Sequence, residues 1–206
     1  MKRYLVQKTA VATSTDTLDW SKAEVLKDFE FVWEHRLAPK TEFRALHDDR
    51  HFYFRFDCQD DDLVLADGPS VKERAVNSDR VEIFFTTDMD LKPYYCLEMT
   101  PRGDALAYSA RFHRKMDWDW TCDGLEVHGS IQKNQYWVAG RVPMATLGKL
   151  GVLHGREIFA GLYRAEYRHQ PDGTIHAGWM PWINPQTEKP DFHVPSSFGV
   201  LELAED

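Results

Sequence analysis

The sequence predicts an all-β protein: a two-sheet antiparallel β-sandwich, of jelly-roll or immunoglobulin-like type, with one or two short helices. Three observations lead to this fold class. Many short segments alternate apolar and polar residues with a period of two, turn-forming residues separate these segments, and helical patterns are sparse. Because no linker rich in Pro, Gly or Ser divides the chain and no internal repeat occurs, we expect one domain over residues 1–206.

The first three predicted strands, residues 51–58, 80–87 and 94–100, alternate most clearly. In each of them the apolar residues fall on one face, as a strand packed on one side against a core requires. These apolar sets are Phe52, Phe54, Phe56 and Cys58, then Val81, Ile83 and Phe85, and finally Tyr95, Leu97 and Met99. The opposite faces of the second and third strands carry Glu82 and Glu98, so these two carboxylates share one face if the strands pair.

Five more strands and the turns between strands complete the predicted sheets. The strands are residues 105–112, 125–131, 135–142, 157–168 and 198–203. Gly, Asn, Asp and Pro separate several of them, because these residues favour the backbone angles of tight turns. The turns are Arg102-Gly103-Asp104, Asp123-Gly124, Lys133-Asn134 and Pro171-Asp172-Gly173.

Two short helices and two long loops interrupt the strands. Asp19 is a typical N-cap for a helix over residues 20–26, and residues 144–150 form one or two helical turns. Residues 58–78 and 178–195 lack alternation, and we expect them to be long loops. Loops of this length in a compact domain commonly carry function.

The charge balance and the apolar runs exclude several classes of partner. The chain has 25 Lys and Arg residues against 33 Asp and Glu residues, a formal net charge of −8, and no basic block. Binding to nucleic acid or to an anionic membrane surface is therefore not expected. No stretch approaches the roughly 20 apolar residues of a membrane span, and the first residues lack the apolar core of a signal peptide. We expect a cytoplasmic protein as the sequence stands, or a secreted or periplasmic one if a signal peptide has been removed.

Five motifs follow one another along most of the chain. They are DDRHFYFRF at 48–56, NSDRVEIFF at 77–85, YYCLEMTPRG at 94–103, WVAGRVP at 137–143, and the closing pair WINP at 182–185 and FHVPSSFGVL at 192–201. In this order they resemble the family 9 carbohydrate-binding modules, which some xylanases carry. The resemblance implies a β-sandwich of the DOMON-like superfamily, bound structural calcium, and recognition of the reducing end of a sugar between two tryptophans. The implied function is non-catalytic binding of plant-type poly- or oligosaccharides, such as xylan- or cellulose-derived ends, in carbohydrate catabolism.

The resemblance matches two site residues and departs at two other positions. Glu82 matches the strand glutamate that hydrogen-bonds sugar hydroxyls, and Trp182 matches one of the two cleft tryptophans. The other cleft tryptophan lies three residues before the Asp of the strand motif, where this chain has Val76. A cleft arginine on the following strand falls at Glu98. The implied site is therefore half retained, and a second aromatic residue from a loop would have to complete it.

Tryptophans outside the predicted strands are the candidates for sugar contact. Aromatic residues make up 13% of the chain, and sugar recognition uses flat apolar faces surrounded by polar groups. Trp179 and Trp182 lie in the Pro-flanked loop, although a buried Trp closing the end of the sandwich is the alternative for Trp182. Trp118 and Trp120 share one face of an extended segment. They either supply the missing platform or cover a sheet edge, and edge covering is favoured.

An acidic run supplies candidate calcium ligands. Calcium binds carboxylate and carbonyl oxygens in flexible geometry, but the spacing here is not that of an EF-hand loop. A solvated acidic loop is the alternative. The candidate ligands are Asp57, Asp60, Asp61 and Asp62.

Three further functions stay open beside carbohydrate binding. A glycosidase would use Glu82 and Glu98 as a pair of carboxylates across the scissile bond, but nothing in the spacing selects hydrolysis. Binding without catalysis is therefore favoured. An interaction domain with a decayed sugar cleft would account for Val76. A haem-binding electron-transfer domain of the DOMON type is the last, and the residues of suitable type for haem ligation are Met99, Met180, His176 and His193.

Overall fold

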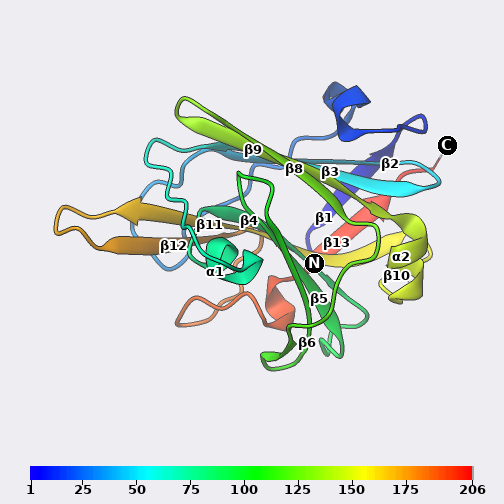
Figure 1. Cartoon of the computed structure of the whole chain (residues 1–206). Helices are drawn as coiled ribbons and strands as arrows, with labels where there is room; N and C mark the ends of the chain where they lie inside the picture. The colour runs from blue at the N-terminus through cyan, green and yellow to red at the C-terminus, as the bar shows by residue number, and fades with distance from the viewer. Residues whose placement is uncertain (206) are drawn as a thin grey trace.

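The computed structural model describes residues 1–205, and strands dominate it (Figure 1). The all-β prediction is confirmed, because the described chain has thirteen strands and only two short α-helices. The helices are α1 (Val71–Val76) and α2 (Met144–Lys149). The strands are β1 (Arg3–Lys8), β2 (Thr41–His47), β3 (His51–Gln59), β4 (Arg80–Thr86), β5 (Tyr94–Met99), β6 (Ala105–Arg111), β7 (Lys115–Asp117), β8 (Glu126–Gln132), β9 (Gln135–Pro143), β10 (Leu153–His154), β11 (Glu157–His169), β12 (Ile175–Pro181) and β13 (Gly199–Leu203).

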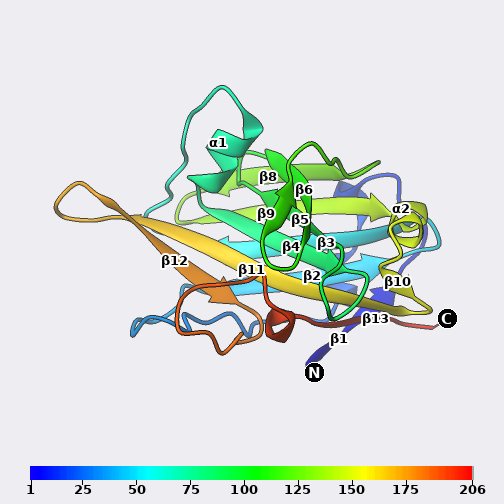
Figure 2. The ribbon, with the colours of Figure 1, turned by 90° about the horizontal axis from the view of Figure 1, so that it is seen from below.

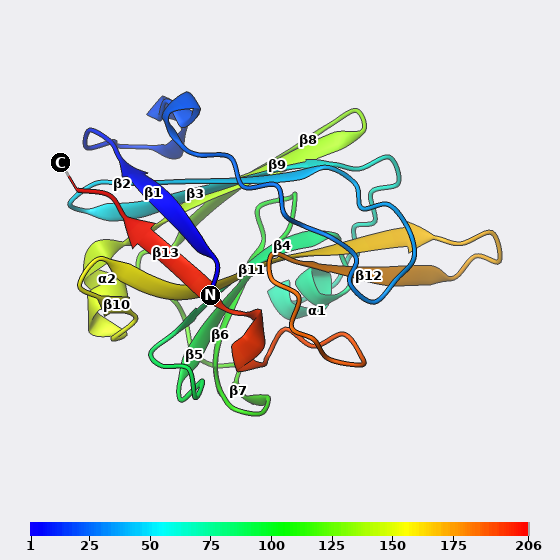
Figure 3. The ribbon, with the colours of Figure 1, turned by 180° about the vertical axis from the view of Figure 1, so that it is seen from behind.

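The strands form one curled mixed sheet in the order β7-β6-β5-β4-β11-β13-β1-β2-β3-β9-β8, with β10 and β12 also paired to β11. The prediction of two separate antiparallel sheets is not confirmed, because β1 joins the two halves of the sheet. It pairs in parallel with β13 on one side and with β2 on the other. Figure 3 shows β1 and β13 side by side. We call the strands from β7 to β13 the β4–β11 half and the strands from β2 to β8 the β3–β9 half.

The main core lies between these two halves. The apolar faces predicted for residues 51–58 and 80–87 meet there, and the ring centroids of Phe52 and Phe85 are 6.1 Å apart. Each fully buried apolar side chain of this size contributes roughly 1.5–3 kcal/mol through removal from water. Period-two alternation therefore reports the side of each strand that faces the core.

A second apolar cluster covers the outer face of the β4–β11 half. Phe84 of β4 lies in it, with its ring centroid 4.9 Å from that of Tyr163 of β11. Phe192, from the segment after β12, stacks on Tyr163 at 4.1 Å and 13°. Ala75 of α1 is also buried in this cluster. Helix α1 and the segment after β12 therefore cover part of the outer face. The cavity described below lies between them.

Both predicted long loops contain regular structure. Within residues 58–78, Ser70 caps α1 and forms a capping box with Glu73, since each side chain accepts a hydrogen bond from the other's backbone N–H. Within residues 178–195, β12 continues to Pro181, and its hairpin with β11 extends beyond the other strands (Figures 1 and 2).

The two helix predictions have different outcomes. Residues 144–150 form α2 as expected, with α2 ending at Lys149. Residues 20–26 form only a 3-10 turn, Trp20–Lys22, although Asp19 caps it as predicted. Among residues 1–205, none of the helices has the length and apolar character needed to cross a membrane.

Candidate functional site

One row of paired residues across three strands positions a wall of the cavity. Arg80 of β4 pairs with Ala165 of β11, which pairs with Trp179 of β12, so the three side chains share the outer face. Because Ala165 is small, the guanidinium carbon of Arg80 lies 5.5 Å from the Trp179 ring centroid. Trp179 also makes edge-to-face contacts with Tyr167 and Phe192, at centroid distances of 6.4 Å and 5.8 Å. These contacts fix the position of the indole ring at the side of the cavity.

The floor of the cavity is a buried group of charged side chains. Glu82 and Glu98 are directly opposite each other on β4 and β5, as the sequence predicted for paired strands. Nε of Arg80 lies 2.9 Å from Oε1 of Glu82 and 2.9 Å from Oε2 of Glu98. Tyr108 of β6 donates a hydrogen bond of 2.7 Å to the other oxygen of Glu98. None of the three charged residues is more than 5% exposed.

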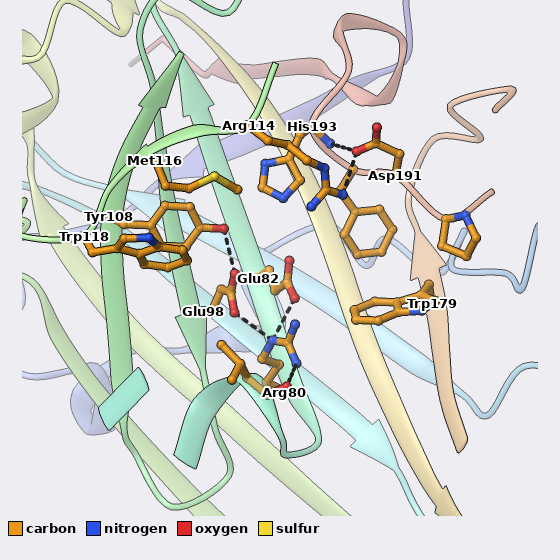
Figure 4. A pocket seen from close by; sticks show the side chains of 13 residues that line it. Arg80, Glu82, Glu98, Tyr108, Arg114, Met116, Trp118, Trp179, Asp191 and His193 are labelled. Carbon is orange, nitrogen blue, oxygen red and sulfur yellow. Dashed lines mark hydrogen bonds and ion pairs between the residues drawn. The ribbon is translucent and has the colours of Figure 1, made fainter. Parts of the chain in front are cut away.

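A second aromatic wall faces the first across the floor. The ring of Trp118 packs against Tyr108 with centroids 4.6 Å apart and planes inclined by 43°. The ammonium group of Lys72, on α1, lies 3.4 Å from the Trp118 ring centroid. Figure 4 shows Trp118 and Tyr108 on one side, Trp179 on the other, and the glutamates of the floor between them. Val76, which occupies the position of the missing cleft tryptophan, also lines the cavity.

The rim of the cavity joins the β6–β7 turn to the segment after β12. Arg114 donates a hydrogen bond of 2.9 Å to Asp191, and a ring nitrogen of His113 lies 2.7 Å from the other oxygen of that carboxylate. His193 is hydrogen-bonded to the hydroxyl of Tyr94 at 2.9 Å. This bond joins the segment after β12 to β5. The whole cavity has a volume of about 210 Å³.

Burial governs the protonation of the floor. Loss of water, and then the neighbouring carboxylate of Glu98, raise the pKa of Glu82 to about 8, against the opposing effect of Arg80. Burial also raises the pKa of Tyr108 well above its ordinary value, so its hydroxyl remains a donor. Burial lowers the pKa of His193 to about 3, which keeps its ring uncharged at neutral pH.

Replacement of Glu82 by Gln should change how stability depends on pH. The ordinary pKa of this group is 4.5 and the folded value is about 8, so between these limits the folded state keeps a proton that the unfolded chain has released. Rising pH in this window therefore destabilises the wild type through Glu82, by at most about 1.4 kcal/mol per pH unit. Urea denaturation from pH 5 to pH 8.5 should show the Glu82→Gln variant gaining stability relative to wild type as pH rises. Parallel curves for the two proteins would contradict the assignment.

Two of the predicted sugar-contact tryptophans lie away from the cavity. Trp182 is only 2% exposed and belongs to the main core, where its ring packs against the backbone of Gly199. A Cβ atom at position 199 would come within 2.7 Å of that ring, so the position needs glycine. Trp120 packs against Tyr95 at a centroid distance of 4.9 Å and covers the opposite face from Trp118. The structure therefore brings together Glu82, Glu98, Trp179 and Trp118 but not Trp182 or Trp120.

The aspartates predicted as calcium ligands do not converge. Each of them contacts a basic side chain, and the residues from 1 to 205 contain no group of three or more His, Cys, Asp or Glu side chains placed to hold a metal ion. The residues at this segment therefore do not fit a shared calcium site, and calcium binding stays a prediction. The contacts join Asp57 to Arg44 (2.9 Å) and Arg55 (2.6 Å), Asp60 to Arg164 (2.8 Å), Asp61 to Arg168 (2.8 Å), and Asp62 to His169 (2.9 Å).

The residues considered for haem ligation are spread over different parts of the fold. Met99 and Met180 are fully buried in the main core. His193 lies on the outer face of the sheet, and His176 is exposed beside Glu34, at 3.2 Å. This distribution does not bring a Met and a His together as a ligand pair.

Several cavity residues were not predicted as site residues. Arg80 carried a detectable signal, because it precedes Glu82 by two positions and so lies on the same face of the strand. Tyr108 likewise lies on a predicted strand, but its contact with Glu98 depends on how that strand pairs. Arg114 and Asp191 come from irregular segments 77 residues apart, and no local pattern marks them.

Comparison with known families decides which group of proteins the chain falls into. The model for the carbohydrate family 9 binding domain-like proteins matches residues 13–206. The chain belongs to this family. No curated protein matches it.

Solved structures of similar fold include both a close overall match and modules with bound sugar. A protein from Bacteroides uniformis, described as a candidate carbohydrate-binding protein, shares 18% identity at a TM-score of 0.79, with 98% of this family 9-like chain and 99% of the other covered. A family 9 carbohydrate-binding module from Caldicellulosiruptor kristjanssonii in complex with glucose has 16% identity and a TM-score of 0.63, covering 100% and 97%. Its complex with cellotriose has 16% identity and a TM-score of 0.61, covering 98% and 93%. At these identities the likeness concerns the fold.

Proposed function

We propose that the cavity binds one unit of a carbohydrate and that this is a non-catalytic carbohydrate-binding protein. The observation that carries the proposal is the pair of aromatic walls, Trp118 and Trp179, on opposite sides of the buried floor. Flat aromatic faces pack against the C–H surfaces of a sugar ring, while charged groups between them bind hydroxyls through strong hydrogen bonds. The floor groups Arg80, Glu82 and Glu98 are placed to do this.

The orientation of Glu82 supports the same proposal. Nε of Arg80 lies 2.9 Å from Oε1 of Glu82 and 2.9 Å from Oε2 of Glu98, so these three buried atoms are paired with one another. The other oxygen of Glu82 points away from the guanidinium group (Figure 4), and Glu82 lines the cavity. A sugar hydroxyl, which both donates and accepts, can form a hydrogen bond with this oxygen.

The size of the cavity favours the end of a sugar chain. Its volume of about 210 Å³ is below the roughly 300–1,000 Å³ typical of pockets for larger ligands. It therefore suits a single ring. Similar modules have been seen with glucose and with cellotriose, and we propose plant-type ligands here, namely cellulose- or xylan-derived ends.

Binding is favoured over hydrolysis by the way the floor is connected. Glu82 and Glu98 both contact the same guanidinium nitrogen of Arg80, so one cation engages both carboxyl groups. A glycosidase instead separates its two carboxyl groups so that they act across the scissile bond.

A calorimetric titration tests the proposed function. The wild type should bind glucose, cello-oligosaccharides or xylo-oligosaccharides without releasing product. The variant Trp182→Phe should be less stable, because it leaves a space in the main core, yet bind with unchanged affinity. Absence of heat with every sugar would overturn the proposal, and turnover of a nitrophenyl glycoside would replace binding with catalysis.

A further inference from the structure

The floor of the cavity has an uneven charge balance. Two buried carboxylates, Glu82 and Glu98, contact one guanidinium group, that of Arg80, and both contacts use the same Nε atom. Neither contact has the geometry of a hydrogen bond, although both distances are short. One guanidinium group cannot balance two carboxylates, so at neutral pH Glu82 keeps a proton unless another cation takes the place of that proton.

Among residues 1–205, the groups near Glu82 supply only part of that positive charge. On the β6–β7 turn, Arg114 favours the ionised form of Glu82, but its guanidinium group is paired with Asp191. The ring of His193, on the segment after β12, is uncharged because burial lowers its pKa to about 3. The ammonium group of Lys72, on α1, lies over the Trp118 ring. The remaining polar neighbour is the hydroxyl of Tyr108, which carries no charge and already donates to Glu98. The raised pKa of Glu82 has this same cause, namely burial beside a second carboxylate.

The free side of Glu82 is open to the cavity. Its Oε1 contacts Arg80, whereas the other oxygen points away from the guanidinium group (Figure 4). The aromatic walls of Trp118 and Trp179 stand on either side of this position. Aromatic faces attract cations through the negative potential above the ring, and an ammonium group can donate three hydrogen bonds. The cavity thus combines an acceptor carboxylate with walls that favour positive charge.

We propose that, among sugars, this cavity selects those with a free amino group, such as glucosamine and its oligomers, with the ammonium group bound to Glu82. The inference rests on the carbohydrate-binding function proposed above. Glucose presents only neutral hydroxyls to the same carboxylate. N-acetylglucosamine carries an uncharged amide that cannot balance it. An ammonium group adds a charge–charge attraction that a hydroxyl lacks, and it takes the place of the proton that Glu82 releases. We expect this to make binding of the amino sugar roughly tenfold tighter.

Calorimetric titrations in phosphate buffer at pH 7 test this selectivity. Glucosamine should bind about tenfold more tightly than glucose or N-acetylglucosamine to the wild type. The ratio of glucosamine to glucose affinity should fall toward one in Glu82→Gln. The matched control Glu42→Gln removes another buried carboxylate, on β2, which Lys40 and Arg44 already neutralise, and should keep the tenfold ratio.

The outcomes separate this inference from the proposed function. Equal binding of glucose and glucosamine would overturn the inference and leave carbohydrate binding intact. No binding of any sugar would overturn both. Ethanolamine, an amine without a sugar ring, should bind far more weakly than glucosamine, and equal affinity would contradict sugar recognition. If Glu82→Gln fails to give a native circular dichroism spectrum, Glu98→Gln serves as the second variant, with the same expected loss of the ratio.

Discussion

Replacement of Arg80 by Met should destabilise the protein by about 3–5 kcal/mol and abolish sugar binding. Arg80 is 5% exposed and contacts both carboxyl groups of the floor, so its removal takes away the cation that keeps a buried carboxylate ionised beside a second carboxyl group. Loss of one partner from a buried ion pair commonly costs this much, because the remaining charge stays in a medium that solvates it poorly. Chemical denaturation measures the stability, and calorimetry measures the binding.

A charge-free version of the floor provides the control for this prediction. The triple variant Arg80→Met, Glu82→Gln, Glu98→Gln contains no buried charge at these positions. It should recover most of the lost stability, because a neutral floor no longer needs a counter-ion. It should not recover binding, since the charged hydrogen-bonding groups are gone. A loss of less than about 1 kcal/mol in Arg80→Met would contradict the burial of this charge group.

Replacement of Trp179 by Ala should weaken sugar binding at least about tenfold, or about 1.4 kcal/mol. The indole ring forms one wall of the cavity, and its removal takes away the apolar surface against which a sugar ring packs. Trp179 is half-buried on the outer face of the sheet, outside the main core, so the fold should persist. Calorimetric titration with the sugar that binds the wild type most tightly measures the effect.

Trp137 offers a matched control for the loss of an indole ring. It is also half-buried, but it lies on β9 in the β3–β9 half, where the guanidinium carbon of Arg55 is 4.8 Å from its ring centroid. Trp137→Ala should leave the affinity unchanged. Equal losses in Trp137→Ala and Trp179→Ala would mean that the change acts through general stability and not through the cavity wall.

The strands that alternate cleanly were predictable from the sequence. Other strands, such as β1 and β2, were not predicted, for physical reasons. Eight predicted strands correspond to β3–β6, β8, β9, β11 and β13, with ends that differ by at most one residue. In β2 the burial covers nearly every position, so an alternating pattern is absent. The continuous sheet depends on β1, whose parallel pairs with β13 and β2 join residues about 200 and 40 positions apart along the chain. No local pattern encodes such pairings.

The candidate site was partly predictable for the same reason. Period two placed Glu82 and Glu98 on one face, and strand pairing then set them opposite each other. The same alternation separates Trp179 of β12 from Trp182, which directly follows the strand. Odd and even positions point to opposite faces, and Met180 lies in the main core with Trp182. The sequence did not predict that Trp118 and Trp179 lie on opposite sides of one cavity. Their placement depends on the strand order β6-β5-β4-β11 and on the pairing of β12 with β11.

The central claim is that a sugar ring binds between Trp118 and Trp179. The most direct measurement is a titration followed by NMR of the indole N–H signals of the seven tryptophans, each assigned by substitution. On addition of sugar, the signals of Trp118 and Trp179 should shift in a saturable manner, while those of Trp137 and Trp182 remain in place. Shifts confined to Trp137 or Trp182, or no shift at saturating sugar, would contradict the claim.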